Sequence, residues 1–204
     1  MPSASPALNV RPAGPADTAA VVATLTGAFH DDPTWSWAFS DPTLRPHQYD
    51  AFWGAMVAGA LRYPWVLMTG GAEAVAVWIP PGGTELAPED EPRLVALIEN
   101  LLGDRAADVL ELMDRFDAAH PHDEPHYYLS LFATRPESRG RGIGMALLRD
   151  DLVAYDAEGV PTYLESSNPA NDARYASVGY RAVGEFSHPT TGAVVTTMWR
   201  PVGG

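Results

Sequence analysis

The sequence predicts a single α/β domain in which one sheet of about seven strands is flanked by helices. The first observation behind this class is that strand-like and helix-like segments alternate along all 204 residues, without an internal repeat or a low-complexity linker. The second is the length, because a chain of this size folds as one domain that buries roughly 70% of its unfolded surface. We therefore expect residues 1–204 to form one domain.

The first half of the chain carries two helical patterns and three strand patterns. Apolar residues recur every three or four positions in residues 15–30 and 46–63, which places them on one face of a helix. Between these helices the aromatic segment 30–39 follows no period, so we expect a loop or a short helical turn there. The Gly70-Gly71 turn between two apolar runs predicts a hairpin. The strands expected in this half are 8–11, 65–69 and 74–79.

The second half continues the alternation. Two amphipathic patterns, residues 94–101 and 109–116, predict a pair of helices after the third strand. A strand at 127–133 leads through a glycine-rich turn into a helix at 145–158. The remaining elements are a strand at 161–167, a brief helix that carries Tyr175, and a closing hairpin of strands 181–187 and 193–200 around Thr191-Gly192.

Composition excludes several classes of protein. No apolar run reaches the length of about 18 residues that a membrane span needs, and residues 1–9 lack the charged and apolar parts of a signal peptide. We therefore expect a cytoplasmic protein with no membrane partner. The absence of cysteine excludes disulfides, thiolate metal sites and a cysteine nucleophile.

The charge distribution is strongly acidic. The net charge is −13, and residues 85–124 hold twelve acidic residues against three arginines. Such a surface repels a phosphate backbone, so we expect no nucleic-acid partner, whereas it attracts a cationic substrate. Charge bias alone fits equally well a solvated surface that keeps the protein soluble.

The most informative motif is a glycine-rich run between the strand at 127–133 and the helix at 145–158. Glycines let the backbone approach a ligand, and the first N–H groups of a helix have no intrahelical partner, so the run predicts a loop that binds a pyrophosphate. It is neither a Walker loop, because the chain has no lysine, nor a dinucleotide fingerprint, because Met145 stands where the third glycine belongs. A plain tight turn is the alternative. The run is Arg139-Gly140-Arg141-Gly142-Ile143-Gly144.

The run follows the pattern R-x-x-G-x-G, with Arg139, Gly142 and Gly144 as its fixed points. It resembles the acyl-CoA loop of the GNAT superfamily of N-acetyltransferases. A second family signature is similar to residues 168–180, where an asparagine-containing turn leads to a tyrosine four residues before a Gly-aromatic pair. The order of elements is most similar to the puromycin N-acetyltransferase subfamily, although only about the last 80 residues match specifically.

The resemblance implies the GNAT fold: a mixed, mostly antiparallel twisted sheet of about seven strands flanked by helices, here with an extra helical pair between the third and fourth strands. It also implies an enzyme that transfers an acetyl group from acetyl-CoA to a primary amine by direct attack. We expect a small cationic or antibiotic-like acceptor, and a monomer or homodimer. The alternatives are a protein acetyltransferase acting on lysine or an N-terminus, and an acyl-CoA sensor without turnover.

The same resemblance assigns acetyl-CoA to the end of the loop strand, the glycine loop, the asparagine turn and the tyrosine helix. The strand end is expected to act through its backbone groups. The cofactor-binding residues implied are Phe132, Ala133, Thr134, Arg139, Gly140, Arg141, Gly142, Ile143, Gly144, Met145, Asn168, Asn171 and Tyr175.

Two residues are candidates for proton transfer, because an amine attacks a thioester only when neutral and the leaving thiolate needs a proton donor. Tyr175 is the candidate acid, as the family pattern has a tyrosine there; packing under the sheet is the alternative. Glu165, at the end of the strand at 161–167, is the candidate base if partial burial raises its pKa. A charged strand end without a chemical role is the equal alternative.

The acceptor is expected near the segment that follows the first helix. His30, Asp31 and Asp32 offer an acidic pair for a cationic amine, although a helix end followed by a turn explains them as well. The off-period aromatics Trp35 and Trp37 are candidates for the wall of the acceptor pocket.

A histidine-rich run at residues 120–126 holds five possible metal ligands. Two prolines stiffen it, and its spacing matches no known zinc pattern. We expect no metal there, and a solvated loop before the strand at 127–133.

Overall fold

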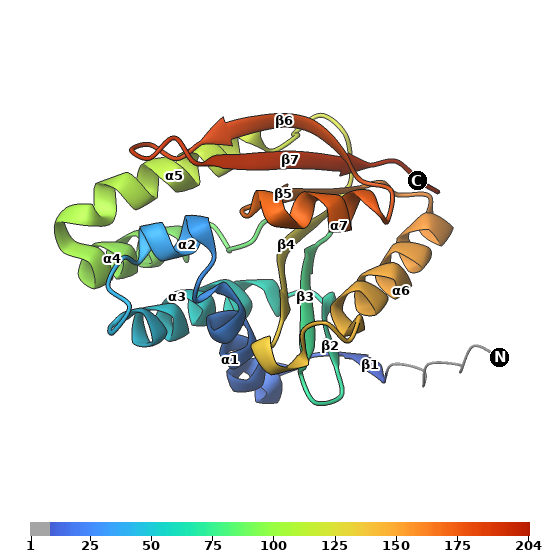
Figure 1. Ribbon diagram of the computed structural model, residues 1–204, viewed down its shortest axis with the longest axis horizontal. Helices are drawn as coiled ribbons and strands as arrows, with labels where there is room; N and C mark the ends of the chain where they lie inside the picture. The colour runs from blue at the N-terminus through green and yellow to red at the C-terminus, as the bar shows by residue number, and fades with distance from the viewer. Residues whose placement is uncertain (1–8) are drawn as a thin grey trace.

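The computed structural model describes residues 9–204. They form one seven-stranded sheet in the order β1-β2-β3-β4-β5-β7-β6, antiparallel throughout except for the parallel pair β4 and β5 (Figure 1). The expected mixed, mostly antiparallel sheet is confirmed. The strands are β1 (Val10–Pro12), β2 (Val66–Thr69), β3 (Ala74–Ile79), β4 (Tyr127–Thr134), β5 (Thr162–Ser166), β6 (Arg181–Ser187) and β7 (Val194–Arg200).

Two sequence predictions concern, in part, residues 1–8, which lie outside the described residues. One is the start of the first strand at residue 8, and the other is the absence of a signal peptide from residues 1–9. Residues 10–12 do form the edge strand β1, two residues later than the sequence pattern indicates.

The described residues also form seven α-helices, and the expected helical pair between the third and fourth strands is confirmed as α4 and α5. Within residues 9–204 the search for a helix long and apolar enough to cross a membrane finds none. The helices are α1 (Thr18–Phe29), α2 (Pro33–Ala38), α3 (Arg45–Ala60), α4 (Glu91–Leu102), α5 (Ala106–Ala119), α6 (Ile143–Glu158) and α7 (Asp172–Ala176).

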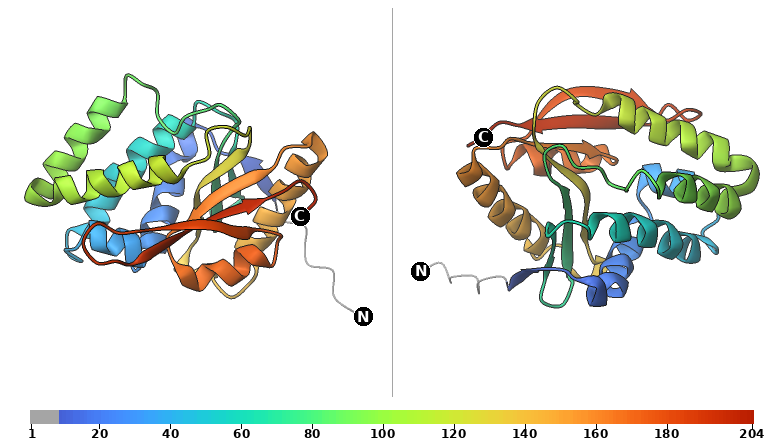
Figure 2. Two further views of the ribbon diagram at one scale, coloured as in Figure 1. Left: turned by 90° about the horizontal axis from the view of Figure 1, so that it is seen from above. Right: turned by 180° about the vertical axis from the view of Figure 1, so that it is seen from behind.

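The sheet separates two hydrophobic cores. Helices α1 to α4 lie on one side of strands β2 to β4, and α6 lies on the other (Figures 1 and 2). The larger core contains the fully buried Leu25 of α1 and Trp53 of α3, so the apolar helical faces read from the sequence are confirmed as core. The smaller core lies under α6 and contains Trp78, Leu147 and Tyr155.

A β-bulge at Ser130 changes which face of the sheet the side chains of β4 enter. Val77 of β3 pairs with Leu131, and the next residue, Trp78, pairs with Leu129, so Ser130 is the extra residue. Because of this insertion, Leu129 packs in the core under α6 while Leu131 packs in the core under α1 and α3. The bulge therefore sets Ser130 apart from both cores.

Strands β4 and β5 run side by side only briefly. They pair at Tyr127 with Thr162 and at Tyr128 with Tyr163, and then separate while β5 stays paired with β7. Residues 129–134 of β4 consequently have no strand partner on the β5 side within the described chain. This separation opens the centre of the sheet and positions the candidate site.

Candidate functional site

The glycine loop forms a turn with unpaired N–H groups at the start of α6. Gly140 and Gly142 both have φ of 74°, a left-handed conformation that costs any other L-residue roughly 1–2 kcal/mol. The N–H groups of residues 140–145 make no hydrogen bond to an acceptor within residues 9–204. Six unpaired N–H groups in succession, at the positive end of a 16-residue helix, form a site for a phosphate or pyrophosphate.

Gly144 serves a different purpose from the first two glycines of the loop. A Cβ atom at this position would collide with Oγ1 of Thr134 and lie 3.4 Å from the ring of Phe132. The first turn of α6 can therefore lie against the end of β4 only because residue 144 is glycine. Ile143 and Met145 pack on the core under α6.

The two arginines of the loop are differently placed. Arg139 donates a hydrogen bond of 2.8 Å from Nη2 to the carbonyl of Ala28, at the negative end of α1, and so ties the loop to that helix. Arg141 is exposed, as is the loop backbone at Gly140 and Gly142. Positive charge and free N–H groups therefore face solvent together.

The end of β4 offers free backbone groups beside the loop. The N–H of Arg135 donates to the carbonyl of Glu73 next to β3, at 2.8 Å. Since backbone groups of successive residues point to opposite edges of a strand, those of Phe132 and Thr134 face the side that β5 has left. Ala133 pairs with Val75 of β3 instead, and its side chain is buried. An extended ligand could therefore pair with Phe132 and Thr134.

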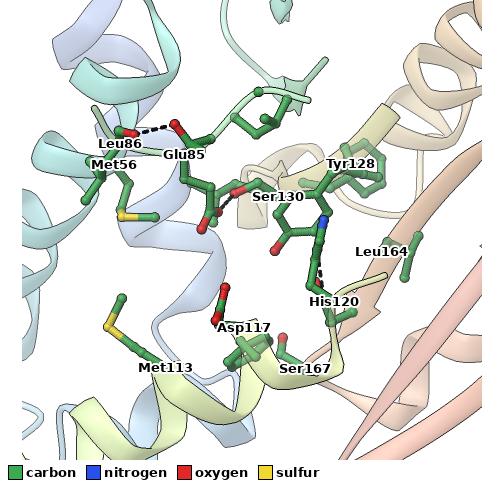
Figure 3. A pocket seen from close by; sticks show the side chains of 18 of the residues that line it. Met56, Glu85, Leu86, Met113, Asp117, His120, Tyr128, Ser130, Leu164 and Ser167 are labelled. Atoms are coloured by element: carbon green, nitrogen blue, oxygen red, sulfur yellow. Dashed lines mark hydrogen bonds and ion pairs between the residues drawn. The ribbon is translucent and has the colours of Figure 1, made fainter. Parts of the chain in front are cut away.

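A cavity of about 1080 Å³ lies where β4 and β5 separate. Its walls come from α3, the segment between β3 and α4, α5, β4, the end of β5 and α7. Figure 3 shows carboxylate, imidazole and thioether side chains directed into it. The sequence-predicted residues that line it are Asp32, Trp35, Phe132, Glu165, Asn171 and Tyr175.

Tyr175 is half-buried at the wall of this cavity. Its ring lies 6.4 Å from that of Phe132 and 6.1 Å from that of Tyr180. Its hydroxyl forms no hydrogen bond within the described residues, and burial raises the pKa of the phenol above its ordinary value. The group is therefore a neutral proton donor at physiological pH.

Glu165 is a buried carboxylate with an unused oxygen. It lies on β5 opposite Thr197 of β7, and its side chain is only 2% exposed. Its Oε1 atom has no hydrogen-bond partner among the described residues, and the nearest imidazole nitrogen, Nδ1 of His120, is 3.7 Å away. Buried charged oxygens without a partner are rare and costly, so this atom points to a missing donor.

Hydrogen bonds fix the tautomers of the two histidines beside Glu165. Nδ1 of His126 lies 2.6 Å from the carbonyl of Glu124, which can only accept, so Nδ1 carries the proton. Burial lowers the pKa of His126, so its Nε2 is a free acceptor and takes the 3.2 Å hydrogen bond from Nε2 of His120. The Nδ1 atom of His120 faces Glu165 and is a donor in the imidazolium form and an acceptor in this neutral tautomer.

The sequence interpretation of the histidine run as a solvated loop is therefore only partly correct. The segment is irregular and residues 122–125 are exposed, but His126 is buried and His120 is half-buried beside the cavity. Within residues 9–204, no group of three or more His, Cys, Asp or Glu is placed to hold a metal ion.

Glu85 and Asp117 also line the cavity, and the sequence interpretation missed both. Glu85 lies in the irregular segment between β3 and α4, where it accepts a hydrogen bond from Oγ of the bulge residue Ser130. Burial raises the pKa of Glu85 to about 7, and the negative charge of Glu165 adds to the shift. Neither residue belongs to a motif, and only the charge bias of residues 85–124 could have indicated them.

Asp32 lies at the cavity but its oxygens are already in use. Oδ1 accepts from the N–H groups of Thr34 and Trp35 at 3.0 and 3.2 Å, which caps α2 and contributes about 1 kcal/mol. Oδ2 accepts from Oγ of Ser167 at 3.0 Å, just beyond β5. Asp32 therefore joins α2 to the end of β5, and the aromatic segment is a short helix.

The other expected acceptor residues divide between the cavity and the surface. Trp35 lines the cavity and packs edge-on against Trp53, with ring centroids 4.9 Å apart. His30 and Asp31 lie outside the lining, and the Asp31 side chain is 93% exposed. Trp37 also lies outside it and donates to Oγ1 of Thr190 at 3.1 Å.

Of the two asparagines predicted to bind the cofactor, Asn171 lines the cavity and Asn168 does not. Oδ1 of Asn168 accepts from the N–H of Ala170 at 3.1 Å and so begins the turn before α7. Asn171 lines the cavity, and its Oδ1 accepts from Nη1 of Arg174 at 2.8 Å. Of the pair, only Asn171 reaches the space between β4 and β5.

Acetyltransferases are among the solved structures that share this architecture. One, described as histone acetyltransferase HPA2 and related acetyltransferase from Corynebacterium glutamicum, has a TM-score of 0.66 and 24% identity over 96% of both chains. Arylalkylamine N-acetyltransferase 2 from Aedes aegypti has a TM-score of 0.66 and 12% identity, over 97% of this chain and 100% of that one. The polyamine N-acetyltransferase of Drosophila melanogaster has a TM-score of 0.63 and 13% identity, over 94% and 98%.

No model of a protein family matches the sequence. At these identities the likeness establishes the fold, which is the seven-stranded GNAT acetyltransferase fold expected from the sequence.

Proposed function

We propose that the protein is an N-acetyltransferase of the GNAT superfamily that transfers the acetyl group of acetyl-CoA to a primary amine of a small cationic acceptor. The observation that carries this proposal is the set of unpaired N–H groups at residues 140–145, next to the separation of β4 and β5. A pyrophosphate site and a free strand edge in one place suit a ligand that has a pyrophosphate and an extended amide arm.

The residues present fit acetyl-CoA as the donor. The N–H groups of residues 140–145 would hold the pyrophosphate, with Arg141 nearby in solvent. The backbone groups of Phe132 and Thr134 would pair with the amides of the pantetheine arm. The acetyl thioester would then enter the cavity that Tyr175 and Glu165 line.

The chemistry follows from the groups around that thioester. Glu165, with the free Nδ1 of His120 beside it, accepts the proton that the acceptor ammonium must lose before it attacks. The new bond joins the amine nitrogen to the carbonyl carbon, the carbon–sulfur bond breaks, and Tyr175 donates its proton to the sulfur. The proton that the acylated nitrogen then loses returns Tyr175 to its neutral form through solvent. With no cysteine in the chain, a cysteinyl intermediate is excluded, and the proposed transfer is direct from donor to acceptor.

The cavity favours a small cationic acceptor. Eight of its lining residues are aspartate or glutamate and none is arginine. Trp35, Trp53 and Met56 give one wall an apolar surface, and α4 and α5 add a further wall. The solved relatives named for arylalkylamine and polyamine acetylation support an amine acceptor of this kind. Within the superfamily we place the chain near the puromycin N-acetyltransferase subfamily, on the order of its sequence features, as a cytoplasmic monomer or homodimer.

Thiol release from acetyl-CoA tests this function directly. The protein is incubated with acetyl-CoA and a panel of aminonucleosides, aliphatic amines, polyamines and a lysine peptide. We expect release with at least one small cationic amine and none above background with the peptide. Release with the peptide alone would favour a protein acetyltransferase, and binding of acetyl-CoA without any release would favour a sensor.

A further inference from the structure

The cavity holds more carboxylates than the reaction requires. A single proton acceptor is enough for the attack of an amine, and Glu165 with His120 already provides it. The lining has no arginine, so the histidines are its only side chains that can carry positive charge. The acidic residues of the lining are Asp32, Glu85, Glu91, Asp114, Asp117, Asp123, Glu124 and Glu165.

Two of these carboxylates face the same part of the cavity from opposite walls. Figure 3 shows Glu85, from the segment before α4, and Asp117, from α5, directed toward one another. They are close enough for the charge of Asp117 to act on Glu85. Ser130 donates to one oxygen of Glu85, which holds the carboxylate in place. Like charges that face each other across a cavity repel, and either protonation of Glu85 or a cation between the two carboxylates relieves that repulsion.

The buried oxygen of Glu165 independently indicates a cationic ligand in this cavity. Its Oε1 is inaccessible to solvent and has no hydrogen-bond partner within residues 9–204. The side chain is almost fully buried, so bulk water does not compensate for the missing donor. An ammonium group in the cavity beside Glu165 would supply the compensating charge.

The same cation cannot both stay bound as an ammonium between carboxylates and act as the attacking amine. Neighbouring carboxylates stabilise the charged form of an amine and raise its pKa, whereas the attacking amine must be neutral. The carboxylates of Glu85 and Asp117 are therefore suited to a cation that stays charged. The attacking amine belongs next to Glu165, where β4 and β5 separate and Tyr175 lines the cavity.

We propose that the acceptor is a diamine, with one amine acetylated beside Glu165 and Tyr175 and the second ammonium bound between Glu85 and Asp117. Met56 and Met113 lie on the side of Glu85 and Asp117 away from His120, and their flexible thioethers border the space around the second ammonium (Figure 3). This substrate class rests on the proposed acetyltransferase function.

The test compares aliphatic α,ω-diamines with n-alkyl monoamines of the same chain length. For the wild-type protein we expect kcat/KM to be at least about tenfold higher for the best diamine than for its monoamine. Glu85→Gln and Asp117→Asn should each reduce this preference by about fivefold or more, mainly through KM for the diamine. Glu99→Gln is the matched control, because it removes one negative charge from the exposed face of α4 outside the cavity, and it should keep the full preference.

Calorimetry separates failure of this inference from failure of the proposed function. Acetyl-CoA is titrated into each variant, and the diamine is titrated with and without CoA. If acetyl-CoA does not bind, the proposed function fails. The inference is then still decided by diamine binding: it holds if the wild-type protein binds the diamine and Glu85→Gln weakens that binding. Equal use of monoamines and diamines, or a preference that survives both substitutions in folded protein, would overturn it.

Discussion

Nδ1 of His120 faces Oε1 of Glu165 at a distance of 3.7 Å, and Nε2 of His120 lies 3.2 Å from Nε2 of His126. Glu165 lies on β5 and His120 at the end of α5, so the contact joins the central sheet to the inserted helical pair. A proton that enters between them is shared by two acceptors in a largely buried site. This arrangement is suited to removing a proton from an ammonium group.

His120→Gln should therefore lower kcat by about tenfold to a hundredfold, because it removes one of the two proton acceptors. KM for acetyl-CoA should stay nearly unchanged, since His120 is not part of the glycine loop. His47→Gln, an exposed histidine of α3 outside the cavity, is the control and should behave as wild type. Unchanged turnover in His120→Gln would remove this residue from the mechanism.

Tyr175→Phe should lower kcat by roughly tenfold to a thousandfold, because the sulfur then leaves without a proton donor. Acetyl-CoA affinity, measured by calorimetry, should change little. Tyr127→Phe is a matched control: its hydroxyl donates to Glu158 at 2.8 Å, away from the cavity. Tyr127→Phe should lower the free energy of unfolding by about 1 kcal/mol and leave turnover unchanged. Equal turnover of both variants would contradict the role of Tyr175.

Gly142→Asp should weaken acetyl-CoA binding by at least about a hundredfold, because it strains a left-handed residue and places negative charge at the N-terminus of α6. Gly192→Asp is the control, since Gly192 has a similar φ of 69° with open space around it, in the turn between β6 and β7. Gly192→Asp introduces the same backbone strain and negative charge, and its affinity for acetyl-CoA should equal that of the wild type. Retained binding in Gly142→Asp would mean that the loop does not hold the pyrophosphate.

Asp151 should make the protein less stable as the pH rises. This α6 residue is 4% exposed, accepts a 2.8 Å hydrogen bond from Nε1 of Trp78, and has its pKa raised by burial from 3.8 to about 7. Below pH 4 the carboxyl is protonated in both states. Between pH 4 and 7 it ionises only in the unfolded chain, so stability falls by up to roughly 4 kcal/mol.

Asp151→Asn should remove that part of the pH dependence. Thermal melting of both proteins from pH 4 to 8 should show the melting temperature of the variant rising relative to wild type across the window. In Asp151→Asn the stability should still fall with rising pH, but less steeply, because the pKa of Glu85 is also raised, to about 7. Parallel melting curves would contradict the protonated, buried Asp151.

Local patterns predicted most of the fold. The helices with two or more full turns, both hairpins and the glycine loop each lie within a short stretch whose periodicity or turn residues are visible in the sequence. Helix α2 was less clear, because six residues show fewer than two turns and no period. The Asp31-Asp32 pair suggested acceptor binding, but residue 32 is the N-cap of that helix.

The cavity residues Glu85, Asp117 and His120 could not be predicted from local sequence patterns. Glu85 is in an irregular segment, Asp117 looks like one more solvated position of an amphipathic helix, and His120 ends that helix. They meet only because the inserted helices pack over the opening between β4 and β5. That opening depends on where two strands stop pairing, which is a property of the whole sheet.

Calorimetric titration with acetyl-CoA and with acetylpantetheine, which lacks the pyrophosphate and the nucleotide, tests the central claim most directly. We expect acetyl-CoA to bind with a Kd on the order of micromolar and acetylpantetheine to bind at least about tenfold more weakly, because the N–H groups of residues 140–145 then have no anion to hold. Equal affinity for the two ligands, or no binding of acetyl-CoA, would contradict the assignment of this loop and of the enzyme built around it.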